Sequence, residues 1–301
     1  CPVGAISMVP QESQADEQPV FDYLVANVGK KPGMPADNTV KGSQFNQPLL
    51  EFSGSCAGCA ETSYARLITQ LFGEHMYISN ATGCSSIWGG PAATSPYTVN
   101  KDTKKGPAWA NSLFEDNAEH GFGMQIGQKV LREQAIASAE KCAASDKAGE
   151  ELKAAFAKFM ETKDDTRANG AAADALAAEL EKAAQAGCPD AAAALEKKDY
   201  LAKKSIWIFG GDGWAYDIGF GGLDHVLAAG ENVNVMVFDT EMYSNTGGQA
   251  SKASNIGEVC QFAAAGKDVG KKSLAEIAMS YGYVYVAQIA LGANMAHAVK
   301  V

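Results

Sequence analysis

Residues Ser205–Gln249 have the sequence SIWIFGGDGWAYDIGFGGLDHVLAAGENVNVMVFDTEMYSNTGGQ, and this stretch decides the fold. An apolar, β-branched run, Ser205–Phe209, breaks into glycines, which predicts a buried strand that ends in a tight turn. Trp214–Ala229 has the apolar spacing of a helix, and Gly230 stands where a helix C-terminal glycine belongs. A second buried strand, Val233–Phe238, follows. Strand, glycine turn, helix and strand predict a βαβ unit of a parallel sheet, and therefore an α/β fold.

The ends of these two strands carry groups that suit a hard cation and a phosphate ligand. Asp212 offers a carboxylate after the first strand, and Thr240 and Asn245 offer neutral oxygens after the second. Parallel sheets bind their ligands at this end of the strands. A diphosphate can lie on the N-terminus of the helix, with Mg²⁺ bridging it to Asp212. An ordinary strand–helix turn would contain similar glycines, so this stretch alone leaves both interpretations open.

Composition and charge exclude several classes of protein. The chain has 301 residues, a net charge of −10 and a pI near 5.0, which argues against a nucleic-acid or anionic-membrane partner. No apolar run reaches transmembrane length and no signal-peptide pattern is present, so we expect a cytoplasmic protein. The chain begins with Cys1 rather than Met, and Val301 interrupts a helical pattern. We therefore expect a fragment of a longer protein.

Three of the seven cysteines lie on predicted loops. Cys56 and Cys59 form a C-x-x-C pair before a predicted helix, Glu61–Phe72, and Cys84 follows a predicted strand, Glu74–Ser79. This uneven spacing is more typical of an intracellular cofactor enzyme than of a secreted disulfide scaffold. Thiolates on such loops can enclose Zn²⁺ or an iron–sulfur cluster, and both take four ligands.

The fourth ligand of such a site is not evident from spacing. Cys260 is one candidate, but the surrounding segment GEVCQFAAAGK predicts a helix that packs Val259, Cys260 and Ala263 inward. Plain buried thiols remain a further interpretation of these cysteines.

The remaining segments organise the chain around this unit. Gln11–Val40 is polar and predicts a surface connector, and Ser251–Gly270 is expected to lie over the ligand. Gln125–Lys204 is rich in Ala, Glu and Lys and predicts a helical insertion, with a separate binding module as the alternative. Tyr283–Ile289 predicts a further buried strand. Helices are predicted over Gly149–Met160, Ala171–Ala186, Ser273–Tyr281 and Asn294–Val301.

The strings GDGWAYDIG and DTEMYSNTGGQ resemble the thiamine diphosphate (TPP) fingerprint. Together with GSCAGCAET, NATGCSSIWGG and PAWANSLFEDNAEHGFGM they are more similar to the pyruvate:ferredoxin (flavodoxin) oxidoreductase family than to other TPP enzymes. The resemblance implies a TPP-binding α/β domain, with a mainly parallel sheet and an Ala-rich helical insertion. It also implies oxidative decarboxylation of pyruvate to acetyl-CoA and CO₂, with coenzyme A as co-substrate. Electrons would pass through [4Fe–4S] clusters to ferredoxin or flavodoxin, in a full-length homodimer.

The resemblance also implies roles for single residues. Asp212 and Thr240 would give side-chain oxygens to Mg²⁺, and Met242 its backbone carbonyl. Asn245 would be the catalytic residue, as a polar contact to the substrate, with a turn-forming Asn as the alternative. The implied cofactor-binding residues are Glu61, Cys84, Gly211, Asp212, Gly213, Trp214, Thr240, Glu241, Met242, Tyr243, Ser244 and Asn245.

Cluster ligands and domain limits follow from the same resemblance. Cys56, Cys59 and Cys84 would hold a [4Fe–4S] cluster beside TPP, with the fourth ligand expected just past Val301. Cys1, followed by proline, resembles the end of a ferredoxin motif and would ligate a cluster of an upstream domain. Residues 1–48 would then be the tail of a two-cluster ferredoxin-like domain and a linker. Residues 49–301 would be the TPP-binding domain, with its helical insertion at about 125–204.

Two alternatives stand beside this interpretation. Related enzymes accept other 2-oxo acids, and a zinc-stapled α/β scaffold without catalytic activity would leave the GDG turn purely structural. The glutamate that activates TPP normally comes from a separate domain, so we expect the 301-residue chain alone to be inactive.

Overall fold

A parallel sheet organises the α/β part of the chain. The structure is a computed structural model that describes residues 3–29, 35–90 and 94–301. Its strands are β1 (Met76–Ala81), β2 (Ala108–Ser112), β3 (Ser205–Gly211) and β4 (Asn234–Phe238). They form a four-stranded sheet in the order β2-β1-β3-β4, with every neighbouring pair parallel. The predicted α/β fold with a mainly parallel sheet is confirmed.

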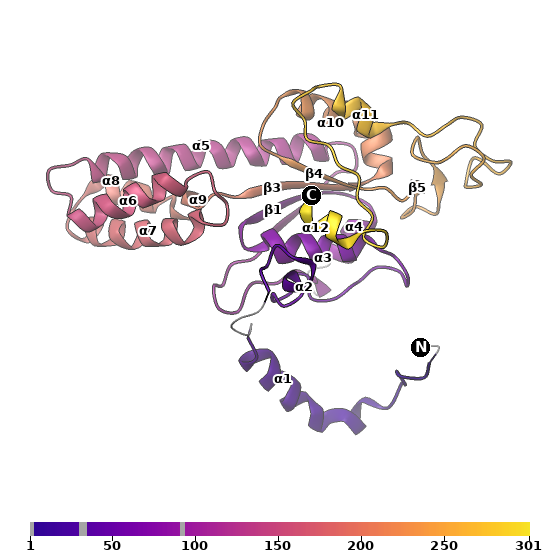
Figure 1. The fold of residues 1–301 in the computed structure, drawn as a ribbon, viewed down its shortest axis with the longest axis horizontal. Helices are drawn as coiled ribbons and strands as arrows, with labels where there is room; N and C mark the ends of the chain where they lie inside the picture. Colours follow the sequence, from indigo (N-terminus) through magenta and orange to yellow (C-terminus); the bar gives the residue numbers. More distant parts are fainter. Residues whose placement is uncertain (1–2, 30–34, 91–93) are drawn as a thin grey trace.

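The two faces of the sheet are covered by different helices. Successive side chains of a strand point to opposite faces. Ile208 of β3 therefore packs into one core cluster with α5 (Asn117–Ala143) and α10 (Phe220–Ala228), while Phe209 packs into another with α3 (Glu61–Phe72). Figure 1 shows α5 and α10 on one side of the sheet and α3 on the other. Both faces are thus buried, which explains the continuous apolar run of β3.

The βαβ unit is present, but its helix has two parts. A π-helical segment, Gly213–Ile218, follows β3, and α10 begins after Gly219. The prediction of one continuous helix over Trp214–Ala229 was wrong at this break. The chain leaves α10 through Gly230, whose φ of 65° is the left-handed conformation expected of a terminal glycine.

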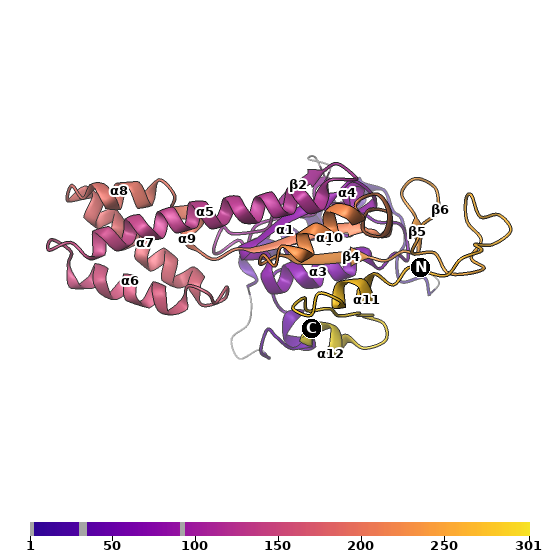
Figure 2. The same cartoon turned by 90° about the horizontal axis from the view of Figure 1, so that it is seen from above.

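A helical unit, defined here as α5 to α9, is inserted between β2 and β3. After α5 come α6 (Glu150–Thr162), α7 (Asn169–Gln185), α8 (Pro189–Leu195) and α9 (Lys198–Leu201). Alanines and leucines dominate its core, which is a cluster separate from those of the sheet. Figures 1 and 2 show α6 to α9 beyond one end of the sheet, with α5 running from the sheet to them.

The first helix of this unit begins earlier than the expected boundary near residue 125. Asn117 starts α5, and its amide Nδ2 donates to the carbonyl oxygen of Phe209 at 2.8 Å. Its Oδ1 accepts from Ser79 Oγ at 2.7 Å. These long-range bonds to β3 and β1 place the beginning of α5 against the sheet.

The N-terminal segment, predicted to be a surface connector, contains helices. A 3₁₀ helix (Gln11–Glu17) leads into α1 (Gln18–Asn27), and every residue of both is exposed. Figure 1 shows α1 standing away from the sheet. A short α2 (Val40–Ser43) follows. Cys1 lies outside the described residues.

Several short elements were not predicted, among them a helix and the edge strand of the sheet. Cys84 begins the short helix α4 (Cys84–Gly89), and Ala108–Ser112, to which no element was assigned, is the edge strand β2. Both are short, and the sequence of β2, AWANS, has no β-branched residue, so periodicity gives little signal there.

The predicted strand Tyr283–Ile289 was wrong: these described residues lie in no strand. The segment runs between α11 (Leu274–Met279) and α12 (Met295–Lys300). Two hydrogen bonds hold the segment in place. At its start, Tyr283 Oη donates to the Ala228 carbonyl at 2.7 Å. Just past its end, the amide of Leu291 donates to Tyr64 Oη at 3.0 Å. Its local β pattern therefore does not lead to pairing with β4.

The predicted helix around Cys260 was also wrong. The amide of Gln261 donates to the Gly248 carbonyl at 2.9 Å, and the amide of Ala250 donates to the Gln261 carbonyl at 3.0 Å. These bonds join the segment to β6 (Gln249–Ala250), which pairs with β5 (Met242–Tyr243). Val259, expected to pack inward, is 68% exposed.

No helix in the described ranges is both long enough and apolar enough to cross a membrane.

Candidate functional site

A cavity of about 250 Å³ opens at the carboxyl ends of β1, β3 and β4. This is the edge where the strand order reverses between β1 and β3, the usual ligand site of open α/β sheets. The predicted site residues that line it are Glu61, Cys84, Gly211, Asp212, Gly213, Thr240, Met242, Tyr243, Ser244 and Asn245. The structure thus brings together residues that are far apart in the chain.

Asp212 is the central polar group of this cavity. Its side chain is almost fully buried, with 1% of its surface exposed. Thr240 Oγ1 lies 2.8 Å from Asp212 Oδ1 and 3.1 Å from the carbonyl oxygen of Met242. The carboxylate, hydroxyl and carbonyl oxygens predicted to hold Mg²⁺ therefore lie side by side, and oxygen donors of this kind are what Mg²⁺ prefers.

Ser251 completes the surroundings of Asp212. Its hydroxyl donates to Asp212 Oδ2 at 2.6 Å. Burial raises the pKa of Asp212, and the hydrogen bonds from Ser251 and Thr240 oppose that rise. Sequence inspection expected this part of the chain near the ligand but did not single out Ser251, because nothing in its local pattern marks a contact with residue 212.

A second buried carboxyl group, that of Glu61, lines the same cavity at the start of α3. Burial raises its pKa, the indole of Trp88 donates to Oε2 at 2.7 Å and lowers it, and the charge of Asp212 raises it further. Two buried carboxyl groups, each with its pKa raised, make the cavity suited to a cation or a hydrogen-bond donor. Trp88 was not identified from the sequence, although it lies in the NATGCSSIWGG string.

Glycines allow the walls of the cavity to approach closely. A Cβ at Gly213 would lie 2.6 Å from the ring of Tyr243 and 3.0 Å from that of Phe114. Gly247 and Gly248 have φ values of 116° and 84°, which side chains rarely adopt, and they close the turn that carries Asn245. Gly213, Gly247 and Gly248 are therefore required by geometry, whatever ligand the cavity holds.

Two predicted cofactor contacts lie outside the cavity lining. Trp214 is fully buried in the core beneath the turn. Glu241 has a strained φ of 65°, and its Oε1 lies 3.4 Å from Lys271 Nζ. In this structure Trp214 supports the wall by packing, and Glu241 faces a lysine on the outer side.

The three cysteines predicted to ligate a cluster lie near the cavity. Cys84 lines it, Cys59 is half-buried and Cys56 is exposed. Burial raises the pKa of the Cys84 thiol to about 11, and Glu61, Cys59 and Cys56 contribute smaller increases. Within the described ranges, no three His, Cys, Asp or Glu side chains are gathered as a metal-binding group. Because metal binding can itself order its ligands, the cluster stays a prediction.

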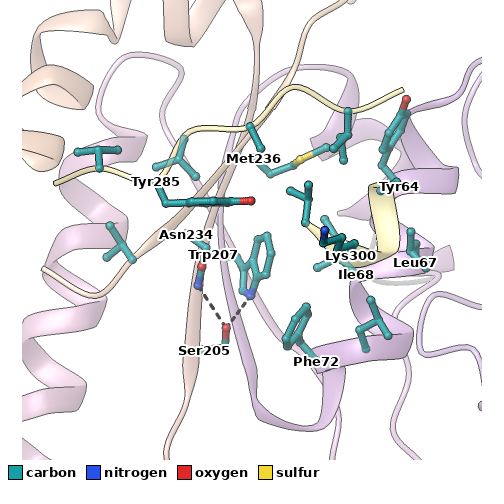
Figure 3. A pocket seen from close by; sticks show the side chains of 18 of the residues that line it. Tyr64, Leu67, Ile68, Phe72, Ser205, Trp207, Asn234, Met236, Tyr285 and Lys300 are labelled. Carbon is teal, nitrogen blue, oxygen red and sulfur yellow. Dashed lines mark hydrogen bonds between the residues drawn. The ribbon is translucent and has the colours of Figure 1, made fainter. Parts of the chain in front are cut away.

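A larger cavity, about 700 Å³, lies along β4, away from the group of oxygens around Asp212. Figure 3 shows its aromatic walls, with Trp207, Tyr64 and Tyr285 around the opening. Ser205 Oγ accepts hydrogen bonds from Trp207 Nε1 at 2.7 Å and from Asn234 Nδ2 at 3.3 Å. It lies where the unpaired segment 283–289 faces β4, and we do not assign the cofactor to it.

Comparison with known proteins confirms the resemblance noted in the sequence. The family model for the C-terminal TPP-binding domain of thiamine pyrophosphate enzymes matches residues 183–301. The chain is 53% identical over 296 residues to the pyruvate-flavodoxin oxidoreductase of Klebsiella pneumoniae, covering 98% of this chain and 25% of the relative. It is 53% identical over 308 residues to the pyruvate:ferredoxin oxidoreductase of Moorella thermoacetica, covering 100% of this chain and 26% of the relative.

A third relative is the mitochondrial pyruvate dehydrogenase (NADP(+)) of Euglena gracilis. It is 48% identical over 304 residues, which are 100% of this chain and 16% of the relative. The chain thus spans about a quarter, or less, of the length of these three relatives. Two of the three are named oxidoreductases, and the third is named a dehydrogenase.

Proposed function

We propose that this chain, homologous over its length to one portion of the pyruvate:ferredoxin and pyruvate-flavodoxin oxidoreductases, binds TPP and Mg²⁺ and serves the oxidative decarboxylation of pyruvate. The observation that carries this proposal is the group of oxygen atoms around Asp212, at the carboxyl ends of the strands. A buried carboxylate, a hydroxyl and a carbonyl meet there, at the carboxyl end of a parallel sheet.

The proposed roles follow from position. Asp212, Thr240 and the Met242 carbonyl would hold Mg²⁺, and the turn Gly211–Gly213 would receive the diphosphate. Bound TPP supplies the carbanion chemistry that lets a 2-oxo acid lose CO₂. Phe114 and Phe238 line the same cavity and would limit the access of water to it.

Asn245 is the proposed polar contact to the substrate. It lines the cavity from the exposed turn between β5 and β6, where its amide can both donate and accept a hydrogen bond. Glu61 and Cys84 lie at the α3 and α4 side of the same cavity and are the proposed further contacts to TPP.

The electron path is the finer part of the proposal. Cys56, Cys59 and Cys84 would ligate a [4Fe–4S] cluster next to TPP, and the electrons would leave through further clusters to ferredoxin or flavodoxin. Coenzyme A would take the acyl group, in a homodimeric enzyme. Cys1 would belong to a cluster of an upstream ferredoxin-like domain, and residues 1–48 would be the tail of that domain and a linker. The names of the relatives, which combine pyruvate with ferredoxin or flavodoxin, support the proposed substrate and electron acceptor.

Calorimetry of TPP binding in the presence of Mg²⁺ tests the cofactor site. We expect binding by the wild-type chain and at least about a hundredfold weaker binding by Asp212→Ala, because a charged ligand of the metal is lost. Asp174→Ala is the matched control, since Asp174 pairs with Lys105 on the surface of the helical unit. Equal affinity of the Asp212 and Asp174 variants would remove Asp212 from the metal site.

Anaerobic reconstitution with iron and sulfide tests the cluster. A broad visible absorption near about 400 nm is expected for wild type and is expected to be lost in Cys56→Ser, Cys59→Ser or Cys84→Ser. Cys260→Ser should retain it, because Cys260 lies in the loop joined to β6. Colourless protein with stoichiometric zinc would instead support the scaffold alternative.

A further inference from the structure

Two cysteines of the helical unit, neither of them part of the proposed cofactor site, lie in direct contact. Cys142 belongs to the last turn of α5, and Cys188 is the residue before α8. Their sulfur atoms are 3.0 Å apart, although the residues are 46 positions apart in the chain. Both are free thiols. A disulfide requires about 2.05 Å between sulfurs, so the two atoms need to approach by only about 1 Å.

The packing around this pair holds the two helices together. Cys142 is 2% exposed and belongs to the same core cluster as Ala139, Ala191 and Ala194. Alanines on both helices let α5 and α8 approach closely enough for the thiols to meet. Pro189, the first residue of α8, restricts the backbone beside Cys188. The contact is therefore set by the tertiary structure of the helical unit.

The two thiols differ in accessibility. Cys188 is half-buried and can be reached by a small oxidant, whereas Cys142 is buried. Burial raises the pKa of the Cys142 thiol to about 12, and the neighbouring Cys188 thiol raises it as well. Because Cys188 is the accessible thiol of the pair, it is the one that an oxidant attacks first, and Cys142 follows.

We propose that Cys142 and Cys188 form a reversible disulfide that staples α8 to α5 when the protein meets a hydroperoxide. In the first step the Cys188 sulfur takes one oxygen from the peroxide, which leaves as water, and becomes a sulfenic acid. In the second step the Cys142 sulfur attacks the Cys188 sulfur, the S–S bond forms, and the hydroxyl leaves as water with the proton of the Cys142 thiol. Two thiols and one hydrogen peroxide thus become one disulfide and two waters. A dithiol reductant reverses the change.

The staple would act on the helical unit without reaching the cofactor cavity. It closes a loop that contains α6 and α7, and cross-links of long loops restrict the unfolded chain. Cys142 lies 25 residues along α5 from Asn117 (142 − 117), which corresponds to about 38 Å of helix. Oxidation here would therefore be separable from loss of a cluster at Cys56, Cys59 and Cys84.

Peptide mapping of the protein after hydrogen peroxide, with free thiols alkylated and no reductant, tests the proposal. Trypsin releases Cys142 and Cys188 in separate peptides, residues 142–147 and 183–197, and Cys260 in 253–267. We expect a linked 142–147/183–197 species about 2 Da below the sum of its parts, because two hydrogens leave. It should disappear on treatment with dithiothreitol and be absent from Cys142→Ala and Cys188→Ser.

Cys260→Ser is the matched control and should still form the linked species. Oxidised wild type should also resist proteolysis between residues 143 and 187 several-fold better than reduced wild type, while Cys188→Ser shows no such difference. The absence of the linked peptide while the Cys260 peptide is oxidised would overturn the proposal. A disulfide between Cys188 and a cysteine other than Cys142 would also overturn it. Both results are measured on the wild-type protein, so neither depends on the folding of a variant.

Discussion

The helical unit and the carboxyl end of the sheet are built on opposite principles. The helical unit buries alanines and leucines, with Leu176, Leu180 and Phe159 fully enclosed. The carboxyl end of the sheet buries two acidic side chains, Asp212 and Glu61, which line the same cavity. Apolar burial stabilises the fold directly, whereas a buried carboxyl group needs hydrogen bonds and a bound cation to offset its desolvation. Side-chain changes in the first region should therefore alter stability, and changes in the second should alter ligand binding.

The largest expected effect is on stability, from Phe159→Ala in the helical unit. Phe159 is fully buried, and the guanidinium of Arg132 lies 6.0 Å from its ring centre. We expect a loss of about 4 kcal/mol in the free energy of unfolding of this unit, because a large cavity remains. Denaturant unfolding followed by helix content measures it. TPP affinity of the folded protein should not change, and a parallel loss of affinity would contradict the separation of the two regions.

Asp212→Asn should weaken the binding of TPP and Mg²⁺ but raise the stability of the ligand-free protein. The amide keeps the size of the side chain but not its charge, so TPP and Mg²⁺ should bind at least about a hundredfold more weakly, or about 2.7 kcal/mol. Without ligand, the variant should be about 1 kcal/mol more stable than wild type, because no buried carboxyl group has to be desolvated. Thermal unfolding with and without TPP and Mg²⁺ measures both quantities. Lower stability without ligand would show that Asp212 is held chiefly for the fold.

Trp88→Phe should have a smaller effect, through Glu61. The substitution keeps an aromatic ring but removes the donor to Glu61 Oε2, so a buried carboxyl group loses its hydrogen bond. We expect about 1.5 kcal/mol lower stability and about tenfold weaker TPP binding. Trp109→Phe is the matched control, because Trp109 Nε1 is buried without a hydrogen-bond partner among the described residues. Equal losses in the two variants would mean that ring size, not the bond to Glu61, matters.

The smallest expected effect is a pH dependence where the helical unit meets the amino end of the sheet. His75 precedes β1 and lies against Gly170 of α7, where a Cβ would come within 2.7 Å of its ring. Burial lowers the pKa of His75, and the positive charge of Lys204 lowers it further. The unfolded chain therefore binds a proton that the folded one does not as the pH falls below about 6.5, and stability should fall in that range.

His75→Gln tests this junction. The variant should lose the part of the acid destabilisation that begins near about pH 6.5, measured as unfolding midpoints between about pH 5 and 8. His297→Gln, in the exposed part of α12, is the control and should follow wild type. An unchanged slope in His75→Gln would mean that other groups cause the pH dependence.

Local sequence patterns predicted several of the strands and helices of this protein. The apolar run of Ser205–Phe209, the helix Glu61–Phe72 and the terminal Gly230 are visible in short windows, and the structure has them. The position of Asp212 directly after a strand also placed it at the correct edge of the sheet. These features depend on side-chain periodicity and backbone conformation, both of which act over a few residues.

Contacts between distant residues could not be predicted in this way. Three contacts join positions that share no local pattern. They are the hydrogen bond from Ser251 to Asp212, the hydrogen bond from Trp88 to Glu61, and the contact between the Cys142 and Cys188 sulfur atoms.

The sequence by itself determined the alternation of strands and helices and the chemical type of the groups at the strand ends, because periodicity and turn residues act locally. Only the tertiary structure decided that Tyr283–Ile289 stays unpaired and that the Cys260 segment joins β6 instead of forming a helix. In both segments long-range hydrogen bonds outweigh local propensity, which amounts to less than about 1 kcal/mol per residue.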